Sequence, residues 1–553
     1  MRRIPWLVIA VIAGLFSVMI TAAMIANLSH LRSADPLRNG DLAALKAELA
    51  QHPKDEALKT KIREHDAAVR SRWFSSVAVG QRGAWLLLLG VALTVLAVKQ
   101  GLRAQEAPFD PRPVPPPNPT RVVAMSRWGL AAGGIVLAIG LLLLGGQPTP
   151  ESQSSGEVTV RSQPSPAELA RNWPSFRGSA SGLAAGAAPI AWDAVAGTGV
   201  LWKIEPPLPG LSSPVVWGDT VYVSGSDGKN QEISAYASAT GDRRWSCRIP
   251  LPAGAVVEAY EATGHAAPTP VTDGQVVVGV FASGVLAAVS CDGRLLWSQS
   301  LGIPDNSYSL AASPVIWQDR VIMQLDQGAV EDGRSALLAF DLSNGRKLWR
   351  TARPVAASWA SPLVTTLAGR AQVITCSDPW VISYDPAQGR EWWRAKVLSG
   401  EVSSSPTVAG GCVIAVKPNA ELVAIRPDGS GDVTASHIAW RGEDSVPDMS
   451  SPTGDATMLA LFNGDMLCCD AVTGTKLWQH PGTNAVIASP IIADGRLYVI
   501  DETGSTTIFA WDRSLKVLGT AHFGEKISST PAVVDGRIYV RGDKHLFCIG
   551  SAP

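Results

Sequence analysis

Side chains that could carry out acid–base chemistry are most concentrated in one stretch of this 553-residue chain, PLPAGAVVEAYEATGH, which ends at His265. Glu258, Glu261 and His265 are of types that serve as general acids and bases, and carboxylates also bind Ca²⁺. Two glutamates three residues apart are nevertheless more often found in a solvated loop. We therefore assign no catalytic residue, do not favour an enzyme, and keep these three as candidate ligand-binding residues.

The adjacent Cys468 and Cys469 could form a redox-active disulfide. However, CCDAVTGTKLW aligns on AFDLSNGRKLW with Cys468 in the place of Ala339, which puts both cysteines inside a predicted strand. Neighbouring side chains of a strand point to opposite faces, whereas a vicinal disulfide needs a distorted turn. We expect two structural thiols. No C-x-x-C-H haem motif and no Cys/His zinc spacing occurs in the sequence, so we predict no metal site.

These residues belong to a repeat whose clearest copy begins with SPVIWQDRVIMQ at Ser313 and ends with AFDLSNGRKLW at Trp349. Two β-branched runs around a polar turn predict a pair of short antiparallel strands. A third strand ends at Asp341, and Asn344-Gly345 suits the hairpin that leads to a fourth strand closed by Trp349. Four strands with an aromatic residue at a fixed place indicate one blade of a β-propeller.

Eight copies of this repeat can be counted from the prolines that open them, Pro214, Pro268, Pro314, Pro362, Pro406, Pro452, Pro490 and Pro531. Six copies close with a tryptophan, namely Trp245, Trp297, Trp349, Trp393, Trp440 and Trp478. The eighth copy stops at Ile549, one strand short, while GVLWKIE at 199–205 carries an unmatched Trp202 before the first copy. The sequence therefore predicts an all-β, eight-bladed propeller closed by pairing this early strand into the last blade, with all seven tryptophans as structural docking residues.

The chain should enter each innermost strand near the mouth of a central channel. Trp359 precedes one such entry and could stack on a ligand. The equivalent places in six other blades hold His265, Tyr308, Glu401, Asp448, Asn484 and Lys526. We take Trp359 and Asp448 as candidate ligand-binding residues, together with the three named above.

The segments ATGDRRW (239–245), SNGRKLW (343–349), AQGREWW (387–393) and VTGTKLW (472–478) resemble the tryptophan-docking repeats of the pyrroloquinoline quinone (PQQ) propeller superfamily. NWPSFRGSASG (172–182) resembles the entry segment of bacterial PQQ-binding-like repeat proteins. The superfamily includes quinoprotein dehydrogenases and the propeller lipoprotein of the outer-membrane β-barrel assembly machinery. The resemblance implies a propeller over 172–553, while one propeller fold hosts many unrelated activities.

Membership of the dehydrogenase branch would imply PQQ with Ca²⁺, a carboxylate base beside the quinone, a vicinal disulfide packed against it, and long insertions covering the site. The opening prolines here are only 38 to 54 residues apart, so the blades are nearly minimal. We therefore predict no cofactor and favour a scaffold that binds a protein or another macromolecular partner. The alternative is a membrane-bound, PQQ-dependent oxidoreductase.

The first 146 residues contain three apolar runs long enough to cross a bilayer as helices. We predict transmembrane helices at 1–28, 77–98 and 124–146, a helical hairpin at 29–76, a proline-rich cytoplasmic loop at 99–123 and a flexible linker at 147–171. The first run could instead be a signal peptide cleaved near Ala22-Ala23.

Orientation follows from the basic residues. Arg2-Arg3 and the basic 99–123 loop favour the cytoplasmic side, which puts the propeller outside the cytoplasmic membrane, in the periplasm of a bacterium with two membranes. The formal net charge is −1, so no nucleic-acid partner is expected.

Overall fold

The computed structural model describes residues 163–252, 257–443, 446–482 and 484–551, with a few isolated positions between 13 and 99. The chain divides into two compact units, 1–159 and 160–553. Within the residues described, no helix is both long and apolar enough to cross a membrane. The predicted hairpin 29–76 and span 124–146 lie outside the described residues, as do most of the predicted spans 1–28 and 77–98, the loop 99–123 and the linker 147–171.

A short helix, α5 (Pro166–Arg171), lies within the segment 147–171, which the sequence predicted to be a flexible linker. Ser165 and Glu168 form a capping box, because Ser165 Oγ accepts from Glu168 N at 3.2 Å and Glu168 Oε2 accepts from Ser165 N at 2.8 Å. This box satisfies two backbone donors of the first turn, and Pro166 needs no hydrogen bond there. A Ser-Pro-x-Glu pattern therefore starts a helix inside a polar segment.

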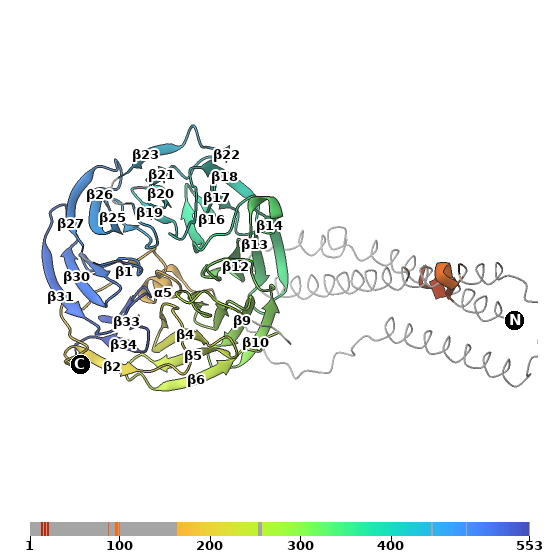
Figure 1. Cartoon of the computed structure of the whole chain (residues 1–553), viewed down its shortest axis with the longest axis horizontal. Helices are drawn as coiled ribbons and strands as arrows, with labels where there is room; N and C mark the ends of the chain where they lie inside the picture. Colours follow the sequence, from red (N-terminus) through yellow and green to blue (C-terminus); the bar gives the residue numbers. More distant parts are fainter. Residues whose placement is uncertain are drawn as a thin grey trace, which may run out of the picture. The chain divides into compact units, whose positions relative to one another are not determined.

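The described residues from β1 onward form eight antiparallel sheets arranged around a central axis, near which α5 lies (Figure 1). Blade 1 contains β3 (Val215–Trp217), β4 (Thr220–Ser226), β5 (Gln231–Ala237) and β6 (Arg243–Arg248). Blade 2 contains β7 (Val271–Thr272), β8 (Val276–Val280), β9 (Val285–Ser290) and β10 (Leu295–Ser300). Blade 3 contains β11 (Val315–Trp317), β12 (Arg320–Leu325), β13 (Ala336–Asp341) and β14 (Lys347–Ala352), with the 3₁₀ turn η1 (Val330–Asp332) between β12 and β13.

The next three blades repeat this order. Blade 4 contains β15 (Leu363–Leu367), β16 (Arg370–Ser377), β17 (Trp380–Tyr384) and β18 (Glu391–Lys396), with β22 (Gly431–Asp432) added in parallel to β18. Blade 5 contains β19 (Thr407–Ala409), β20 (Cys412–Lys417), β21 (Glu421–Ile425) and β23 (Ile438–Gly442). Blade 6 contains β24 (Thr453–Gly454), β25 (Met458–Asn463), β26 (Asp465–Asp470) and β27 (Lys476–Pro481).

The last two blades take strands from both ends of the propeller. Blade 7 contains β28 (Ile491–Ala493), β29 (Arg496–Ile500), β30 (Ser505–Ala510) and β31 (Val517–His522), with β1 (Leu183–Ala184) parallel to β28. Blade 8 contains β32 (Ala532–Val534), β33 (Arg537–Arg541), β34 (Leu546–Ile549) and β2 (Val200–Ile204). Trp202 of β2 pairs with Cys548 of β34, so the predicted closure of the ring is confirmed.

Two details of the predicted repeat were wrong. The second blade opens with Thr269-Pro270 rather than at Pro268, because β7 begins at Val271. Trp349 lies in the middle of β14 and does not end it, since the strand continues to Ala352 to match the length of β13. Both errors concern register within a blade and leave the number of blades unchanged.

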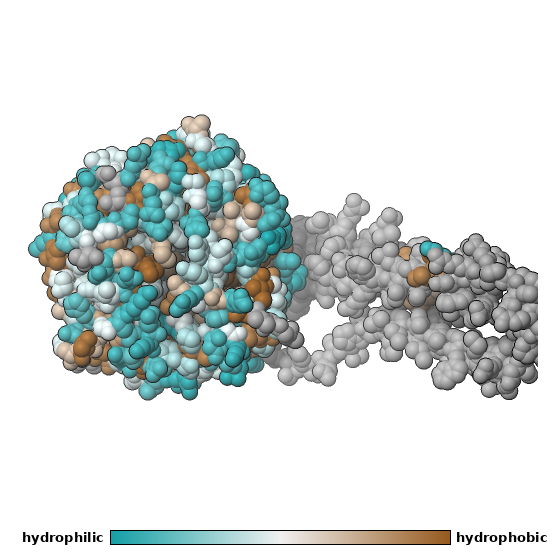
Figure 2. All heavy atoms as spheres, in the orientation of Figure 1, coloured by the Kyte–Doolittle hydropathy of each residue, from teal (hydrophilic) through white to brown (hydrophobic). Residues whose placement is uncertain are grey.

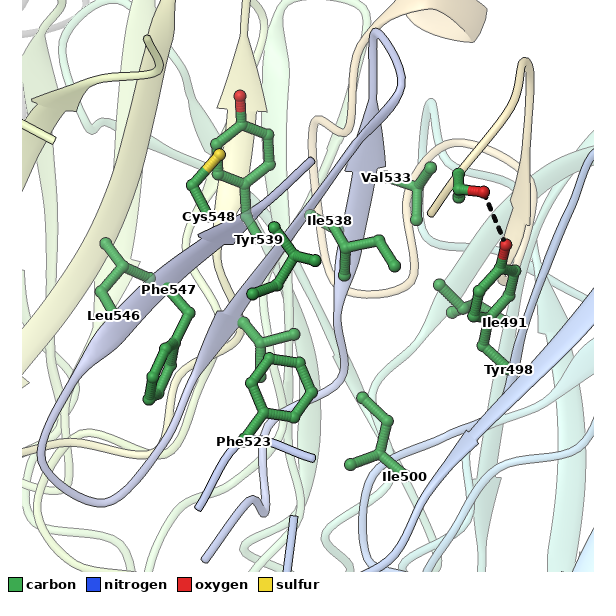
Figure 3. Close-up of a cluster of buried hydrophobic side chains, with 14 of the residues drawn as sticks. Ile491, Tyr498, Ile500, Phe523, Val533, Ile538, Tyr539, Leu546, Phe547 and Cys548 are labelled. Carbon is green, nitrogen blue, oxygen red and sulfur yellow. Dashed lines mark hydrogen bonds between the residues drawn. The ribbon is translucent and has the colours of Figure 1, made fainter. Parts of the chain in front are cut away.

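Apolar side chains from facing sheets fill the space between neighbouring blades. Figure 3 shows this packing between blades 7 and 8, where Ile491, Ile538 and Phe547 are buried. Tyr498 belongs to the same cluster, and its hydroxyl donates to the carbonyl of Ala188 at 3.0 Å (Figure 3). One sheet alone would leave these side chains exposed to water, so each blade depends on its neighbours for its hydrophobic core.

The closing tryptophans contact the following blade. The indole N–H groups of five donate to a backbone oxygen there at 2.8 to 3.1 Å, namely Trp202, Trp245, Trp297, Trp440 and Trp478. Trp349 packs against Gly389, where an added Cβ would lie 2.5 Å from the indole ring, but its N–H has no acceptor in the described structure. Trp393 instead donates to Gln372 Oε1 at 2.9 Å within its own blade.

Cys468 and Cys469 both lie in the regular strand β26, as the alignment predicted. Cys468 belongs to the cluster shared with blade 7, and Cys469 to the cluster shared with blade 5. Their side chains therefore point to opposite faces of the sheet, and neither forms a disulfide. Burial raises the pKa of Cys468 to about 12.

Candidate functional site: the central channel and its open mouth

A closed circle of hydrogen bonds surrounds the channel. Each blade has a serine or threonine directly before the proline that opens its innermost strand. The backbone N–H of this residue donates to the side-chain hydroxyl of the corresponding residue in the next blade, with N–O distances of 2.9 to 3.1 Å. The eight members of this belt are Ser213, Thr269, Ser313, Ser361, Ser405, Ser451, Ser489 and Thr530. A residue before proline is held extended, so each Ser/Thr-Pro dipeptide presents donor and acceptor around the ring. The repeated motif thus has a physical role in joining all blades.

Residues 172–182, which we call the plug, close one end of the channel. Trp173 forms a backbone bridge with Val216 of β3, with both N–O distances at 2.9 Å. The buried guanidinium of Arg177 donates to the carbonyl oxygens of Ser181 at 2.8 Å, Pro406 at 3.4 Å and Pro452. Burial lowers the pKa of Arg177 to about 9. The plug is therefore bound to blades on different sides of the ring.

The other end of the channel opens into a cavity of about 560 Å³. Belt hydroxyls and Phe176 of the plug lie at its inner side, and the loops that connect one blade to the next form its walls. Because neighbouring strands are antiparallel, the connections between blades and those between second and third strands share this open end. Connections between third and fourth strands lie at the plug end.

Three aromatic side chains from successive loops form an arc along the cavity wall. The ring centroids of Tyr260 and Tyr308 are 5.0 Å apart with an interplanar angle of 77°, and those of Tyr308 and Trp359 are also 5.0 Å apart, at 58°. Tyr260 reaches this place because its N–H donates to Ser309 Oγ at 2.8 Å. Edge-to-face contacts of this kind hold aromatic groups in a defined arrangement.

The charged residues of the cavity are mainly acidic. Glu401, Asp448 and Glu502 line it together with one cation, Lys526. Glu401 Oε1 accepts a hydrogen bond from the Tyr308 hydroxyl at 3.1 Å, and this carboxylate raises the pKa of Tyr308. Within the described structure, none of the three carboxylates forms a salt bridge.

The structure brings two of the five candidate ligand-binding residues into the cavity, Trp359 and Asp448. Glu258 and Glu261 are exposed and do not line it. His265 is half-buried beside Gly228, with Nε2 at 3.1 Å from Val257 O. Of the segment before blade 2, it is therefore Tyr260 that lines the cavity, and not Glu258, Glu261 or His265.

Sequence reasoning also misjudged two positions in blade 7. Asn484 turns away and donates to Asp501 Oδ2 at 2.8 Å. Glu502, in the connection after β29, lines the cavity in its place. Two loops of each blade reach the open end: the one before the innermost strand and the one between the second and third strands. The sequence prediction considered only the first of these loops, whereas Glu502 lies in the second.

A buried ion pair supports the loop that carries Trp359. Arg353 Nε lies 2.7 Å from Asp326 Oδ1, and both side chains have no exposed surface. Ser358, next to Trp359, donates to Asp326 Oδ2 at 3.0 Å. Burial alone lowers the pKa of Arg353, but the interactions with Asp326 and Tyr384 together outweigh burial and hold that pKa above its ordinary value. The network spans blades 3 and 4 and was not foreseen from the sequence.

The residues of the cavity do not fit PQQ with Ca²⁺. PQQ is a tricarboxylic acid, so a cavity with three carboxylates and one lysine opposes its charge. No group of three or more His, Cys, Asp or Glu that could hold a metal ion occurs among the described residues. Trp359 could stack on a ring system, but stacking alone does not offset this mismatch of charge.

Comparison with known proteins agrees with the fold. The family model described as outer membrane protein assembly factor BamB matches residues 170–358, 333–481 and 462–549. No protein of curated function matches the chain in sequence.

Several solved structures are similar to it. A europium-containing methanol dehydrogenase has 11% identity and a TM-score of 0.54, over 68% of this chain and 90% of its own. Quinohemoprotein alcohol dehydrogenase from Comamonas testosteroni has 14% identity and a TM-score of 0.50, over 70% and 82%. BamB from Moraxella catarrhalis has 18% identity and a TM-score of 0.47, over 64% and 99%. At these identities the structural likeness concerns the fold alone.

Proposed function

Because this chain belongs to the family described as outer membrane protein assembly factor BamB, we propose that its propeller is a binding module for a protein partner. The proposal places the propeller outside the cytoplasmic membrane, held there by the apolar runs within residues 1–146. The basic residues at 2–3 and in 99–123 support this orientation. The anchor would keep the module near partners that cross or leave the same membrane.

The observation that carries the proposal is a set of exposed apolar side chains at the open end, beside the cavity. Tyr260, Ile303, Val330 and Met449 are large hydrophobic residues with exposed fractions of 48%, 50%, 39% and 50%. Each lies in a connection between blades or between second and third strands, so all four lie at the open end. Two of them, Tyr260 and Met449, also line the cavity, and exposed apolar surface that adjoins a concave site is typical of protein interaction sites. Figure 2 shows one face of the propeller, on which hydrophobic and hydrophilic residues are interspersed.

Site-specific cross-linking of the full chain in its native membranes tests this proposal. A photoreactive phenylalanine analogue at Met449 is expected to give a discrete protein adduct that mass spectrometry identifies. Val472 is a matched control, because it is 60% exposed and apolar but lies between the third and fourth strands of blade 6, at the plug end.

The same adduct should weaken when Ile303→Lys is introduced into the Met449 cross-linking variant, because a charge at an apolar contact disfavours docking. An adduct at Val472 with none at Met449 would place the partner at the wrong end and refute the proposed site. Adducts of equal yield at both positions would indicate non-specific contact and refute it too.

The quinoprotein alternative is tested by titrating the full chain with PQQ and Ca²⁺ while following absorbance and dye reduction with alcohols. The acidic cavity predicts no tight binding and no turnover. Stoichiometric binding with turnover would overturn the scaffold proposal.

A further inference from the structure

We propose that the open mouth binds a basic side chain, arginine or lysine, which an extended segment of the protein partner inserts into the cavity. The inference rests on the proposed function and adds the chemistry by which the partner is recognised. It follows from the aromatic arc, from the three carboxylates that form no salt bridge in the described structure, and from the closed inner end of the cavity.

The aromatic arc provides the first half of a cation site. Tyr260, Tyr308 and Trp359 form a continuous aromatic wall, with neighbouring centroids 5.0 Å apart. A guanidinium or ammonium group is attracted to the face of such rings when it lies within about 6 Å of a centroid, and tryptophan is the strongest partner. The alkyl part of an arginine or lysine side chain packs well on the same surface.

The carboxylates provide the second half. Glu401, Asp448 and Glu502 come from three different loops and line the same cavity as the arc. The hydrogen bond from Tyr308 to Glu401, 3.1 Å long, joins the aromatic and acidic parts directly. With a single lysine among them, the walls carry an excess of negative charge, and a concave site with low-dielectric walls concentrates the resulting potential.

The shape of the cavity selects a side chain over a threaded strand. The inner end is closed by belt hydroxyls and Phe176, so an occupant must enter and leave through the open end. Tyr260 and Met449, which are 48% and 50% exposed, continue the cavity outward onto the surface of the propeller. A partner segment can fill both regions: its side chain projects into the cavity while its backbone lies across Tyr260 and Met449.

Fluorescence anisotropy with the full chain in detergent tests the inference. The probes are four labelled peptides of one Gly/Ser sequence that differ only at the central residue, which is arginine, lysine, citrulline or glutamate. We expect the arginine and lysine peptides to bind, citrulline to bind about tenfold more weakly than arginine, and glutamate to show no binding. Raising the salt from about 0.05 M to about 0.5 M should weaken the arginine peptide because the site is open to solvent.

Variants assign the binding to the cavity. Trp359→Ala should weaken the arginine peptide about fivefold, and Glu401→Gln about threefold. Trp359→Phe should weaken it less, because a ring is kept and the indole N–H has no acceptor in the described structure. Trp317→Ala is the control, since Trp317 lines a second cavity, at the plug end of the channel, and not the cavity at the open mouth, so this variant should leave binding unchanged.

Thermal unfolding of each variant separates loss of binding from loss of fold. If arginine and citrulline peptides bind equally, or if Trp317→Ala weakens binding as much as Trp359→Ala, the inference is refuted. A cross-linked partner at Met449 without preference for arginine would refute the inference and leave the proposed function standing. Preference for arginine without any adduct at Met449 would support the cation site and count against the docking function.

Discussion

Separating the buried pair Arg353–Asp326 should destabilise the propeller far more than its single salt bridge suggests. Both side chains are fully buried, and Nε–Oδ1 is 2.7 Å while Nη2–Oδ2 is 3.1 Å. Removing one partner of such a pair leaves a charge without compensation, which costs about 3–5 kcal/mol.

The two single variants should differ in a definite direction. In Arg353→Met, the carboxylate of Asp326 keeps donors from Gln324, Ser358 and Ser377, so we expect the lower value, about 3 kcal/mol. In Asp326→Asn, the guanidinium keeps only neutral acceptors, so we expect about 5 kcal/mol. The double variant buries no charge and should lose no more than either single one.

Urea unfolding of the full chain, followed by near-ultraviolet circular dichroism, gives the free energies for this cycle. Arg394 and Glu391, which are 33% and 24% exposed and 2.6 Å apart, form the control pair, with an expected loss of about 0–1 kcal/mol on removing either partner. If the double variant lost the sum of the two single losses within about 0.5 kcal/mol, the two residues would act independently and the reasoning would be wrong.

Three further predictions concern the blades. Gly389→Ala should destabilise the protein about 1–3 kcal/mol more than Gly369→Ala in the same urea assay. Both glycines have positive φ, but only Gly389 packs against Trp349. Equal losses of stability would show that the clash between the added methyl group and the Trp349 ring is relieved. Cys468 should stay unlabelled by maleimide at neutral pH until denaturant is added, because burial raises its pKa to about 12, and mass spectrometry of the labelled peptide checks this. Burial alone raises the pKa of Glu525, but hydrogen bonds from the side chain and backbone of His545 outweigh burial and lower that pKa overall. The folded state therefore binds a proton at Glu525 less tightly than the unfolded state does. The wild type should be more stable than Glu525→Gln at a pH above the ordinary glutamate pKa, and this difference should disappear as the pH falls below that value. A difference in stability that persisted at low pH would contradict the prediction.

The repeat architecture was predictable because each blade must bury two faces with few residues. The spacing of the Ser-Pro dipeptides and tryptophans follows from that need, and the unmatched Trp202 indicated the closure that β2 and β34 form. The register of blade 2 was less accessible, because Pro268 and Pro270 both suit a strand entry. The start of β7 at Val271 and the circle of hydroxyls, in which Thr269 takes part, distinguish them in the structure.

The candidate site was predictable only in part. Trp359 and Asp448 lie where the repeat places them, since the loop before each innermost strand has a fixed position in its blade. His265 does not, because it belongs to an inserted segment whose path depends on contacts such as that between Tyr260 and Ser309. The pairing of Asp326 with Arg353 joins side chains whose closeness arises only after the blade has formed.

The position of the plug determines how mechanical load would reach the ring. Any force transmitted through the residues before Ser165 meets α5, the Trp173–Val216 bridge and the buried Arg177 before it meets β2. These contacts attach to blades 1, 5 and 6 and not to the pairing of β2 with β34. Tension applied to the N-terminal side of α5 would thereby be shared among several blades, and the strand pair that closes the circle would carry little of it.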